Sequence, residues 1–306
     1  MVLKVIAVTG AAGMLGRHII AALEFSGFDT ISISRLTATD RSWRQWDLNQ
    51  WQTEKKFDEV FKSVDAIVHA GAAVPNREKP YSEQELFDVN VRATLNLADW
   101  ARKRKVPLVY ISGAIVYKKT DAESILEDSA LGWSGLGGFY GMTKLLAENQ
   151  LIQEKNSGLE LAIIRTSSIY GYGLSSDKLI CSFLEKAHTG STIELMEPIK
   201  DSVDFIHAAD VSVAVVNILK NKSWSIFNIS SGQFTSIHKL AELAVSIVKN
   251  GDISVQQSNQ EVGKKAARFG LECKKAKVKL GWRVNIGITE GMRSVFEKQV
   301  LVVGRK

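Results

Sequence analysis

Short runs of β-branched residues alternate with longer amphipathic runs through the first half of the chain, and this alternation restricts the fold more than any other feature. The predicted strands are residues 3–9, 28–34, 43–46, 64–70, 106–112 and 159–165, and the predicted helices are 14–26, 52–62, 83–104 and 139–156. Strands that alternate with helices pair in parallel and are covered by helices on both faces. The sequence therefore predicts an α/β fold with a doubly wound parallel sheet.

A glycine-rich turn joins the first predicted strand to the first predicted helix. The stretch "VTGAAGMLG" contains Gly10, Gly13 and Gly16, with Met14 and Leu15 where the helix begins. Glycines allow a tight turn and let the backbone approach a pyrophosphate, whose charge the helix N-terminus favours. Such a triplet also fits a plain strand-to-helix turn, but its place in the chain predicts a Rossmann dinucleotide site.

The end of the second predicted strand, "DTISISR", bears on which dinucleotide binds. An acidic side chain here would accept hydrogen bonds from the ribose 2′-hydroxyl of NAD, whereas this chain has Ser34 and Arg35. A hydroxyl and a guanidinium suit a 2′-phosphate better, which favours NADP. NAD stays open as the alternative, with Arg35 as a surface residue.

The pattern changes after residue 166, where glycines, a proline and polar residues separate shorter elements. This change indicates a smaller lobe beside the sheet. We expect residues 1–166, with a return segment at about 203–222, to form the dinucleotide-binding Rossmann domain. Residues 167–202 and 223–306 are expected to form a smaller C-terminal substrate lobe.

The 306-residue chain has the composition of an ordinary globular protein, with 45% hydrophobic and 24% charged residues. No basic leader precedes the first strand and no apolar run approaches the roughly 20 residues of a membrane helix, so we expect a cytoplasmic protein without membrane contact. The net charge of +6 is dispersed, which argues against nucleic-acid binding. Cys181 and Cys273 lie far apart and predict neither a disulfide nor a metal site.

A tyrosine and a lysine lie four residues apart near the start of a predicted helix. In "GGFYGMTKLLAENQL", Tyr140 and Lys144 share one helix face. A nearby ammonium favours the phenolate and lowers the pKa of the tyrosine toward working pH, which makes Tyr140 a candidate general acid and base for a hydroxyl or carbonyl group. A Y-x-x-x-K pair alone also fits an exposed helix surface.

Eight short motifs follow one another along the chain in this order: "TGAAGMLG", "WDL", "VDAIVHAGAA", "DVNVRATLNL", "YGMTK", "RTSSIYGYG", "DFIHAADV" and "KLGW". With them the chain resembles the extended short-chain dehydrogenase/reductases, and in particular the NAD(P)-dependent nucleotide-sugar epimerase/dehydratase group. The resemblance spans essentially the whole chain, and the ordered set is far more specific than any one stretch.

The resemblance implies roles for individual residues. Those implied to lie along the cofactor are Met14 and Leu15 over the pyrophosphate, Asp47 and Leu48 against the adenine, Ala70, Gly71 and Ala72 on its path, and Asn90 in the central helix near the site. It also implies that Lys144 binds the nicotinamide ribose in addition to tuning Tyr140. Members of the group commonly pair the helices predicted at 83–104 and 139–156 across a two-fold axis, which predicts a homodimer, with burial inside one subunit as the alternative.

The stretch "ISGAI" ends a predicted strand with almost no side-chain volume. Ligands bind beyond the carboxyl ends of such strands, so residues 112–114 are expected to face the nicotinamide and the reacting carbon. The resembled group carries Ser or Thr where this chain has Gly113, to hydrogen-bond the substrate hydroxyl. The adjacent Ser112 is the third catalytic candidate, although neighbouring strand residues point to opposite faces, so it can act there only if the strand bends.

Three further positions depart from the pattern of the group. Val203 stands where nucleotide-sugar enzymes carry an Arg for the diphosphate, Ser168 where they carry an Asn, and Lys118 where they carry a Gly. Loss of a guanidinium removes bidentate phosphate recognition. The cofactor half of the chain therefore matches the group better than the substrate half.

The leading hypothesis is an NAD(P)-dependent epimerase or dehydratase that acts on a nucleotide-linked sugar by transient hydride transfer, with Tyr140 exchanging the hydroxyl proton. Two alternatives stay open. Val203 and Arg35 fit an NADPH-dependent carbonyl reductase whose substrate has no diphosphate. Gly113 fits a catalytically impaired dinucleotide-binding protein with a regulatory role.

Overall fold

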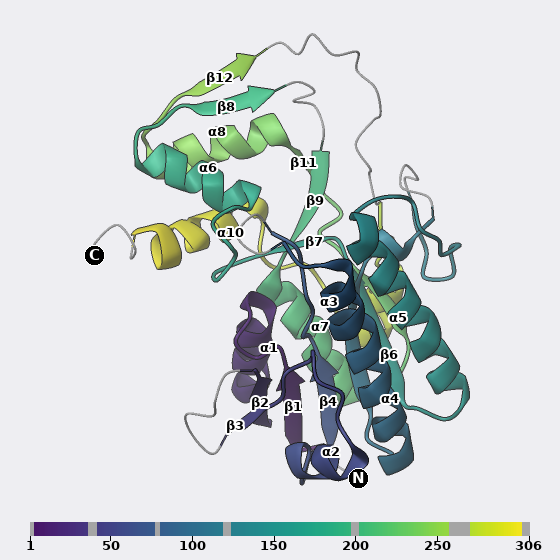
Figure 1. The fold of residues 1–306 in the computed structure, drawn as a ribbon. Helices are drawn as coiled ribbons and strands as arrows, with labels where there is room; N and C mark the ends of the chain where they lie inside the picture. Colours follow the sequence, from purple (N-terminus) through teal and green to yellow (C-terminus); the bar gives the residue numbers. More distant parts are fainter. Residues whose placement is uncertain are drawn as a thin grey trace.

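The computed structural model describes residues 3–35, 42–76, 80–118, 124–196, 202–256 and 270–301. These residues contain a seven-stranded parallel sheet, with a smaller lobe beyond its carboxyl edge (Figure 1). In sheet order the strands are β10 (Ile226–Ile229), β6 (Leu161–Thr166), β5 (Leu108–Gly113), β4 (Ala66–His69), β1 (Val5–Thr9), β2 (Asp29–Ser34) and β3 (Trp43–Gln45). The chain passes from β1 outward to β3 and then returns to β4 on the other side of β1, which creates a topological switch point there. The predicted doubly wound Rossmann sheet is confirmed.

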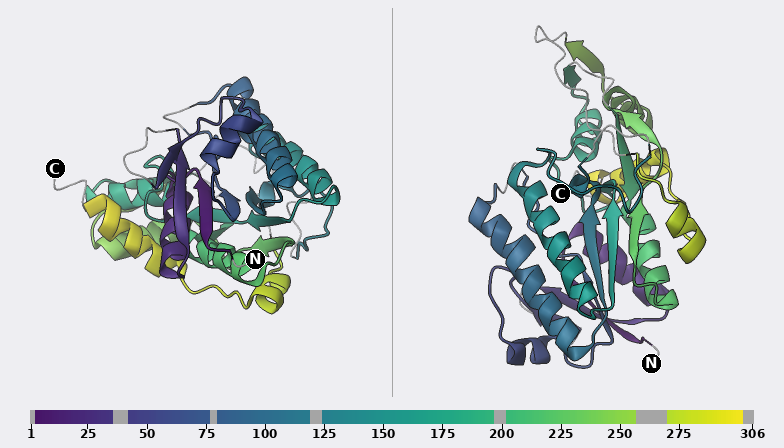
Figure 2. Two further views of the ribbon diagram at one scale, coloured as in Figure 1. Left: turned by 90° about the horizontal axis from the view of Figure 1, so that it is seen from below. Right: turned by 90° about the vertical axis from the view of Figure 1, so that its right-hand side faces the viewer.

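Helices cover both faces of the sheet because its strands are apolar on both sides. One face packs against α1 (Met14–Phe25), α7 (Ala208–Asn221) and α9 (Lys274–Leu280), and the other against α2 (Glu54–Val60), α4 (Ala93–Arg104) and α5 (Gly138–Asn156). Figure 2 shows the two helix layers on either side of the strands. In the described part of the chain, no helix is both long and apolar enough to cross a bilayer.

The helix predicted over 83–104 is present but interrupted. It begins as α3 (Glu83–Phe87). There the Ser82 side chain accepts a hydrogen bond from the backbone N–H of Glu85, and the Glu85 carboxylate accepts one from the backbone N–H of Ser82. It then widens into the π-helical turn η1 (Asp88–Arg92) before continuing as α4. π-Helical turns occur frequently at functional sites, and this one carries Asn90.

The second lobe has its own apolar core. One small sheet consists of β7 (Ser168–Tyr170), β9 (Ser202–His207) and β11 (Phe234–Ser236), in which β9 pairs in parallel with β7 and antiparallel with β11. A second consists of β8 (Ile193–Met196) and β12 (Ile253–Gln256). The helices are α6 (Leu179–His188), α8 (Ile237–Val248), α10 (Ile288–Val295) and η3 (Phe296–Val300). The short 3-10 turn η2 (Ala114–Val116) follows β5 at the boundary between lobes. Leu184, Leu240 and Met292 are buried among these helices.

The segments that return to the sheet are more extensive than the sequence indicates. We expected all of 223–306 to belong to the second lobe, but β10 pairs in parallel with β6, and Ala276 and Trp282 pack against the sheet face that α1 and α7 cover. β10 is only four residues long, so its apolar run is too short to be distinguished in the sequence from a loop. The rest of the division into two lobes stays a prediction.

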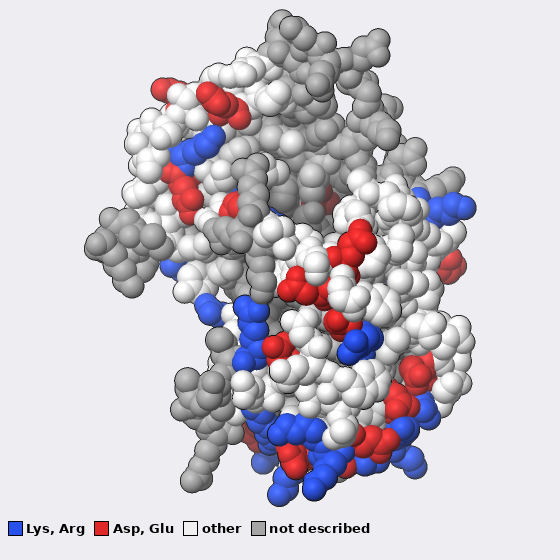
Figure 3. Space-filling view, in the orientation of Figure 1, with Lys and Arg blue, Asp and Glu red and all other residues white. Residues whose placement is uncertain are grey.

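Basic residues near the amino end of the sheet are neutralised locally. Figure 3 shows both signs of charge interspersed over the end of the molecule that contains α2 and α4. Three residues of the basic stretch at 102–105, "RKRK", form ion pairs: Arg102 with Asp99 and Glu154, Lys103 with Asp99 and Glu54, and Arg104 with Asp58. This part of the described surface therefore has no continuous basic face of the kind that nucleic-acid binding uses.

Candidate active site

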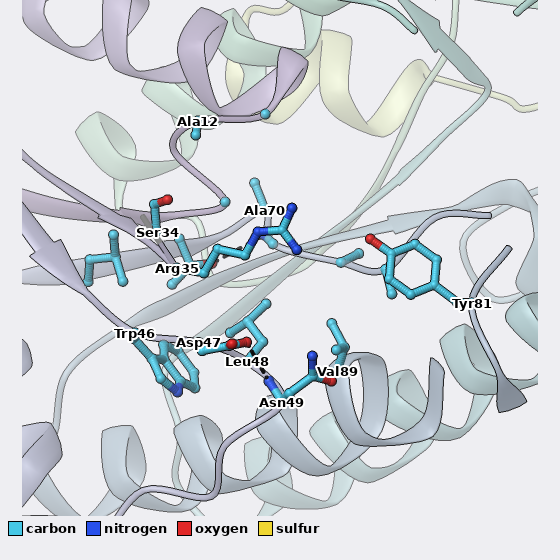
Figure 4. A pocket seen from close by; sticks show the side chains of 17 residues that line it. Ala12, Ser34, Arg35, Trp46, Asp47, Leu48, Asn49, Ala70, Tyr81 and Val89 are labelled. Carbon is cyan, nitrogen blue, oxygen red and sulfur yellow. Dashed lines mark hydrogen bonds between the residues drawn. The ribbon is translucent and has the colours of Figure 1, made fainter. Parts of the chain in front are cut away.

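A cavity of about 340 Å³ lies beyond the carboxyl ends of β1, β2 and β4 (Figure 4). Eight of the predicted cofactor residues line it: Gly10, Gly13, Arg35, Asp47, Leu48, Ala70, Gly71 and Ala72. Six other predicted cofactor residues do not line it, namely Met14, Leu15, Gly16, Asn90, Tyr140 and Lys144. The cavity is thus built from segments far apart in the sequence, as the switch point of a doubly wound sheet requires.

The glycines of the turn are required by close backbone contacts. Gly10 has a φ of +68°, and a Cβ there would lie 2.6 Å from the Cα of Gly71, so β1 and the segment after β4 touch without a side chain between them. A Cβ on Gly16 would collide with the carbonyl oxygen of Gly10. Gly13 donates its backbone N–H to the same oxygen at 2.9 Å. Any larger residue at Gly10 or Gly16 would push the turn open.

The amino end of α1 lies at this turn, with Gly13 in the cavity wall. Gly13 is the N-cap and makes no side-chain cap hydrogen bond, and the first turn of α1 contains no acidic residue. Helix N-terminal N–H groups that lack a side-chain acceptor favour an anion. Met14 begins α1 beneath the loop after β7, because a Cβ on Gly173 would lie 3.5 Å from the Met14 Cα.

The far end of the cavity is formed by Arg35 and the segment after β3. Figure 4 shows the Arg35 side chain extending across the cavity above Asp47 and Leu48. Gln45 donates from Nε2 to the Arg35 carbonyl oxygen at 3.2 Å, and Asp47 accepts from the backbone N–H of Asn49 at 3.0 Å. These contacts hold the backbone of the segment while the guanidinium of Arg35 faces the cavity.

Asn90 connects the segment after β4 to α5. Its Oδ1 accepts from the backbone N–H of Ala73 at 2.8 Å, and its Nδ2 donates to the Ala73 carbonyl at 3.0 Å and to Thr143 Oγ1 at 3.1 Å. Thr143 in turn donates to the carbonyl oxygen of Tyr140 at 2.7 Å. Both amide hydrogens of Asn90 are used within the protein, so its side chain aligns the helix that carries Tyr140 with the cavity wall.

Lys144 is buried and held by β5. Its Nζ donates to the Ile111 carbonyl oxygen at 2.8 Å and lies 4.3 Å from the centre of the Tyr110 ring. Burial lowers the pKa of Lys144 to about 7, and the Glu148 carboxylate opposes this shift. Lys144 is therefore only partly protonated near neutral pH.

The expected lowering of the Tyr140 pKa is wrong for this structure. Burial raises the pKa of Tyr140 to about 12. The physical reason is that the ammonium of Lys144 is bound by Ile111 on the β5 side, while the Tyr140 ring packs beside Ala73, Leu86 and Val89. Desolvation of the phenolate therefore decides the direction of the shift.

Ser112 points away from the role expected for it. Its Oγ donates to Glu148 Oε2 at 2.6 Å, and Glu148 Oε1 accepts from Arg165 Nε at 2.7 Å, with all three residues buried. Strand alternation sends Ser112 to the α5 side of the sheet and Gly113 to the other side. The single hydroxyl proton of Ser112 is therefore committed to Glu148, and this geometry does not support Ser112 as a catalytic hydroxyl.

Two of the departures from the resembled pattern lie on one face of the small sheet. Ser168 on β7 is opposite Phe205 on β9, and Val203 is two residues from Phe205 on the same strand. Residues two apart on a strand share a face, so Ser168 and Val203 line one side of the sheet between the lobes. That side has the isopropyl group of Val203 where a guanidinium is expected and the hydroxyl of Ser168 where an amide is expected.

Sequence reasoning missed the charged pair beneath the site. Arg165 donates to Glu148 and from Nη1 to Tyr117 Oη at 2.9 Å and to the Glu127 carbonyl at 2.8 Å. The position of Glu148, four residues after Lys144, was a signal that could have placed it on the same helix face. Nothing local in the sequence indicates that Arg165, inside an apolar strand, is its partner.

Comparison with known proteins agrees with this geometry. Residues 6–230 match the model of the NAD dependent epimerase/dehydratase family. The chain is 25% identical over 303 residues to a Methanocaldococcus jannaschii protein provisionally named a UDP-glucose 4-epimerase, with 95% of this chain and 96% of the relative covered. It is 24% identical over 270 residues to a dTDP-4-dehydro-6-deoxy-D-allose reductase of Streptomyces sp, with 80% and 81% covered.

Among solved structures, MoeE5 in complex with UDP-glucose and NAD has the same fold, with a TM-score of 0.82 at 23% identity over 97% of this chain and 99% of that one. The family resemblance carried by the ordered motifs is confirmed. Because the family model covers the whole parallel sheet with its glycine turn, the chain belongs to the NAD dependent epimerase/dehydratase family.

Proposed function

We propose that this protein is an NAD(P)-dependent enzyme that oxidises and reduces a hydroxyl-bearing carbon of a nucleotide-linked sugar, as an epimerase or dehydratase. The observation that carries the proposal is the cavity in which Gly10 and Gly71 meet backbone to backbone beside the uncapped start of α1. The cofactor, when bound, supplies a nicotinamide carbon that accepts and returns a hydride.

The residues around the cavity fit a dinucleotide. Gly10 and Gly13 line the cavity without side chains, so a pyrophosphate would approach their backbone directly. Asp47 and Leu48 would hold the adenosine end. At the opposite end the segment Ala70–Ala72 leads along the cavity wall toward α5, which carries Tyr140 and Lys144.

Tyr140 is proposed to exchange a proton with the substrate oxygen. With a pKa raised to about 12 it keeps its proton at neutral pH, so it is ready to protonate an oxygen whose carbon gains a hydride. The opposite direction requires the phenolate, and Lys144, one turn further along the same helix face, is the cation that would favour it.

We propose NADP as the favoured dinucleotide, with NAD as the alternative. Arg35 supports NADP because its guanidinium faces the cavity next to the end of β2, where the 2′-position of the ribose binds in doubly wound sheets. The MoeE5 structure was solved with NAD, so the two dinucleotides have to be compared directly on this chain.

A second candidate function is an NADPH-dependent carbonyl reductase. The observation that favours it is the face formed by Ser168 and Val203, which has no guanidinium to bind a diphosphate. A proton-bearing Tyr140 suits reduction equally well. One relative is itself named a reductase.

We also propose a homodimer through α4 and α5, in the cytoplasm. Leu86, Val89 and Leu97 are buried inside the subunit, whereas Leu146 on α5 is 40% exposed. An interface would therefore use the outer side of α5. Light scattering on the purified protein distinguishes a dimer of the 33.8 kDa chain from a monomer.

Native mass spectrometry of the freshly purified protein tests the proposed function. One NAD or NADP retained per chain would support a cofactor that is recycled within each turnover, as in an epimerase or dehydratase. A protein that arrives empty and binds added NADPH reversibly would support the reductase. Failure to bind either dinucleotide would refute both.

The companion variant is Tyr140→Phe, assayed with UDP- and dTDP-linked sugars by following the products. We expect turnover to fall by about 10² or more, since general acid–base catalysis contributes at least that much, while dinucleotide binding is unchanged. Unchanged turnover would remove Tyr140 from the mechanism.

A further inference from the structure

A row of flat side chains crosses the sheet and ends at Lys144. The Trp46 ring is stacked on His69 with centres 6.3 Å apart and planes 21° apart, and His69 is stacked on Tyr110 at 5.9 Å and 25°. The ammonium of Lys144 lies over the Tyr110 ring, 4.3 Å from its centre. The row joins Trp46, which lines the cofactor cavity, to the lysine on α5.

The Tyr110 ring replaces part of the water that Lys144 loses on burial. Lys144 is only 4% exposed, and the one hydrogen bond of its ammonium within the described residues goes to Ile111. An aromatic face attracts a cation through the negative charge above the ring, and the attraction is strongest where water is excluded. Tyr110 is 1% exposed and its hydroxyl has no hydrogen-bond partner, so a reason other than hydrogen bonding is needed for this ring here.

The other charged and titratable groups around the Lys144 ammonium also favour a cation at this position. Glu148, one helical turn after Lys144, faces it with negative charge, and Arg165 on β6 is paired with Glu148. His69 on β4 would repel Lys144 if protonated, but burial lowers the pKa of His69 to about 3 and keeps the ring neutral. Its Nδ1 lies 2.7 Å from Thr9 Oγ1 and its Nε2 lies 3.1 Å from Thr94 Oγ1. Tyr140 on α5 is the remaining titratable group in this cluster, and it is neutral below about pH 12.

We propose that Tyr110 is a positioning residue whose ring, stacked on His69, holds the ammonium of Lys144 in place and favours its charged form over the neutral amine. This deepens the proposed function, since Lys144 acts there on Tyr140, but the effect on Lys144 exists whether or not that reaction is the correct one. The hydroxyl of Tyr110 contributes little, and the ring carries the effect.

The test measures the pKa of Lys144 directly, in protein labelled with ¹³C at the lysine ε-carbon, without substrate or added cofactor. The Lys144 signal is assigned by its loss in Lys144→Arg. Tyr110→Leu, which removes the ring, is expected to lower this pKa by about one unit, and Tyr110→Phe, which keeps it, is expected to leave it within a few tenths of a unit. Phe57→Leu is the control, because Phe57 is a buried ring in the same core whose ring contacts are with Trp46, Phe61 and Trp100 rather than with Tyr110.

An unchanged Lys144 pKa in Tyr110→Leu, or an equal fall in Phe57→Leu, would overturn the proposal. Should Tyr110→Leu not fold, Tyr110→Met removes the ring with a more adaptable side chain and is judged by the same criterion. Where the enzyme is active, Tyr110→Leu should also shift the fall of kcat at high pH downward by the same one unit. A shifted pKa without any turnover in the parent protein would refute the proposed function and leave the role of Tyr110 standing.

Discussion

A Cβ added to Gly113 would come no closer than 3.8 Å to the carbonyl oxygen of Thr166, on the neighbouring strand β6. Its next contact, with the Ile115 side chain, is at 3.9 Å, and the φ of −154° is ordinary extended backbone. The absence of a side chain at this position is therefore not a requirement of the fold. It leaves space at the end of β5, on the side of the strand opposite Ser112.

We expect Gly113→Ser to fold normally, with a free energy of unfolding within about 0.5 kcal/mol of the parent, because the site has room and no strain. We expect kcat/KM to fall, since the hydroxymethyl group fills space that the substrate uses. Gly113→Ala is the matched control for volume without a hydroxyl. A large gain in activity with Ser but not with Ala would instead identify a site that has lost its catalytic hydroxyl.

Glu148→Gln should be strongly destabilising. The change leaves the buried Arg165 without its carboxylate, and breaking a buried ion pair from one side typically costs about 3–5 kcal/mol. Urea unfolding followed by circular dichroism measures the loss. Glu154→Gln on the same helix is the control, because its partner Arg102 is partly exposed, and such a pair contributes only about 1 kcal/mol or less. Equal losses of unfolding free energy in the two variants would contradict the prediction that the buried ion pair contributes more to stability than the partly exposed one.

Arg35→Glu should discriminate between the dinucleotides. The change replaces a cation at the cavity with an anion, so NADPH is expected to bind at least tenfold more weakly, about 1.4 kcal/mol, while NADH binds as well or better. Titration calorimetry with both dinucleotides gives the ratio. Lys56→Glu is the charge-matched control, since Lys56 is exposed on α2 and paired with Glu59. If both variants weaken NADPH equally, the effect is one of overall charge.

The stability of the protein should fall as the pH is lowered from about 6.5 to about 4. Burial lowers the pKa of His207 to about 4, whereas an unfolded histidine has a pKa near 6.5. Between these values the unfolded chain binds the proton that the folded chain excludes, so unfolding becomes easier as pH falls, by about 1 kcal/mol per pH unit for one such group.

His207→Asn should make this dependence shallower. Asn can accept the hydrogen bond from Ala209 that His207 Nδ1 now accepts at the start of α7, but it does not titrate. Guanidinium unfolding at several pH values provides the slopes. His238→Asn, at a half-buried position on α8, is the matched control for the same substitution elsewhere in the chain. A slope that His207→Asn does not alter would assign the effect to other groups.

The parts of the fold that the sequence predicts are those specified by local pattern. The strand, glycine turn and helix around Gly10 are recognisable because each residue type is required by its own backbone geometry. The ring of Tyr110 is different, because its contact with Lys144 depends on how α5 packs across β5. In the same way, spacing places Tyr140 and Lys144 on one face but contains no information on desolvation, which is why the direction of the Tyr140 shift could not be predicted.

The contact between Gly10 and Gly71 also has a consequence for how binding competence arises during folding. The two residues belong to β1 and to the segment after β4, so the turn acquires its final shape only after the intervening chain has closed into a large loop. Closing such a loop is a slow, entropically costly step compared with forming a helix. Recovery of dinucleotide affinity during refolding should therefore lag behind recovery of helical signal, and a nascent chain that ends before Gly71 would present the glycine motif without the ability to bind.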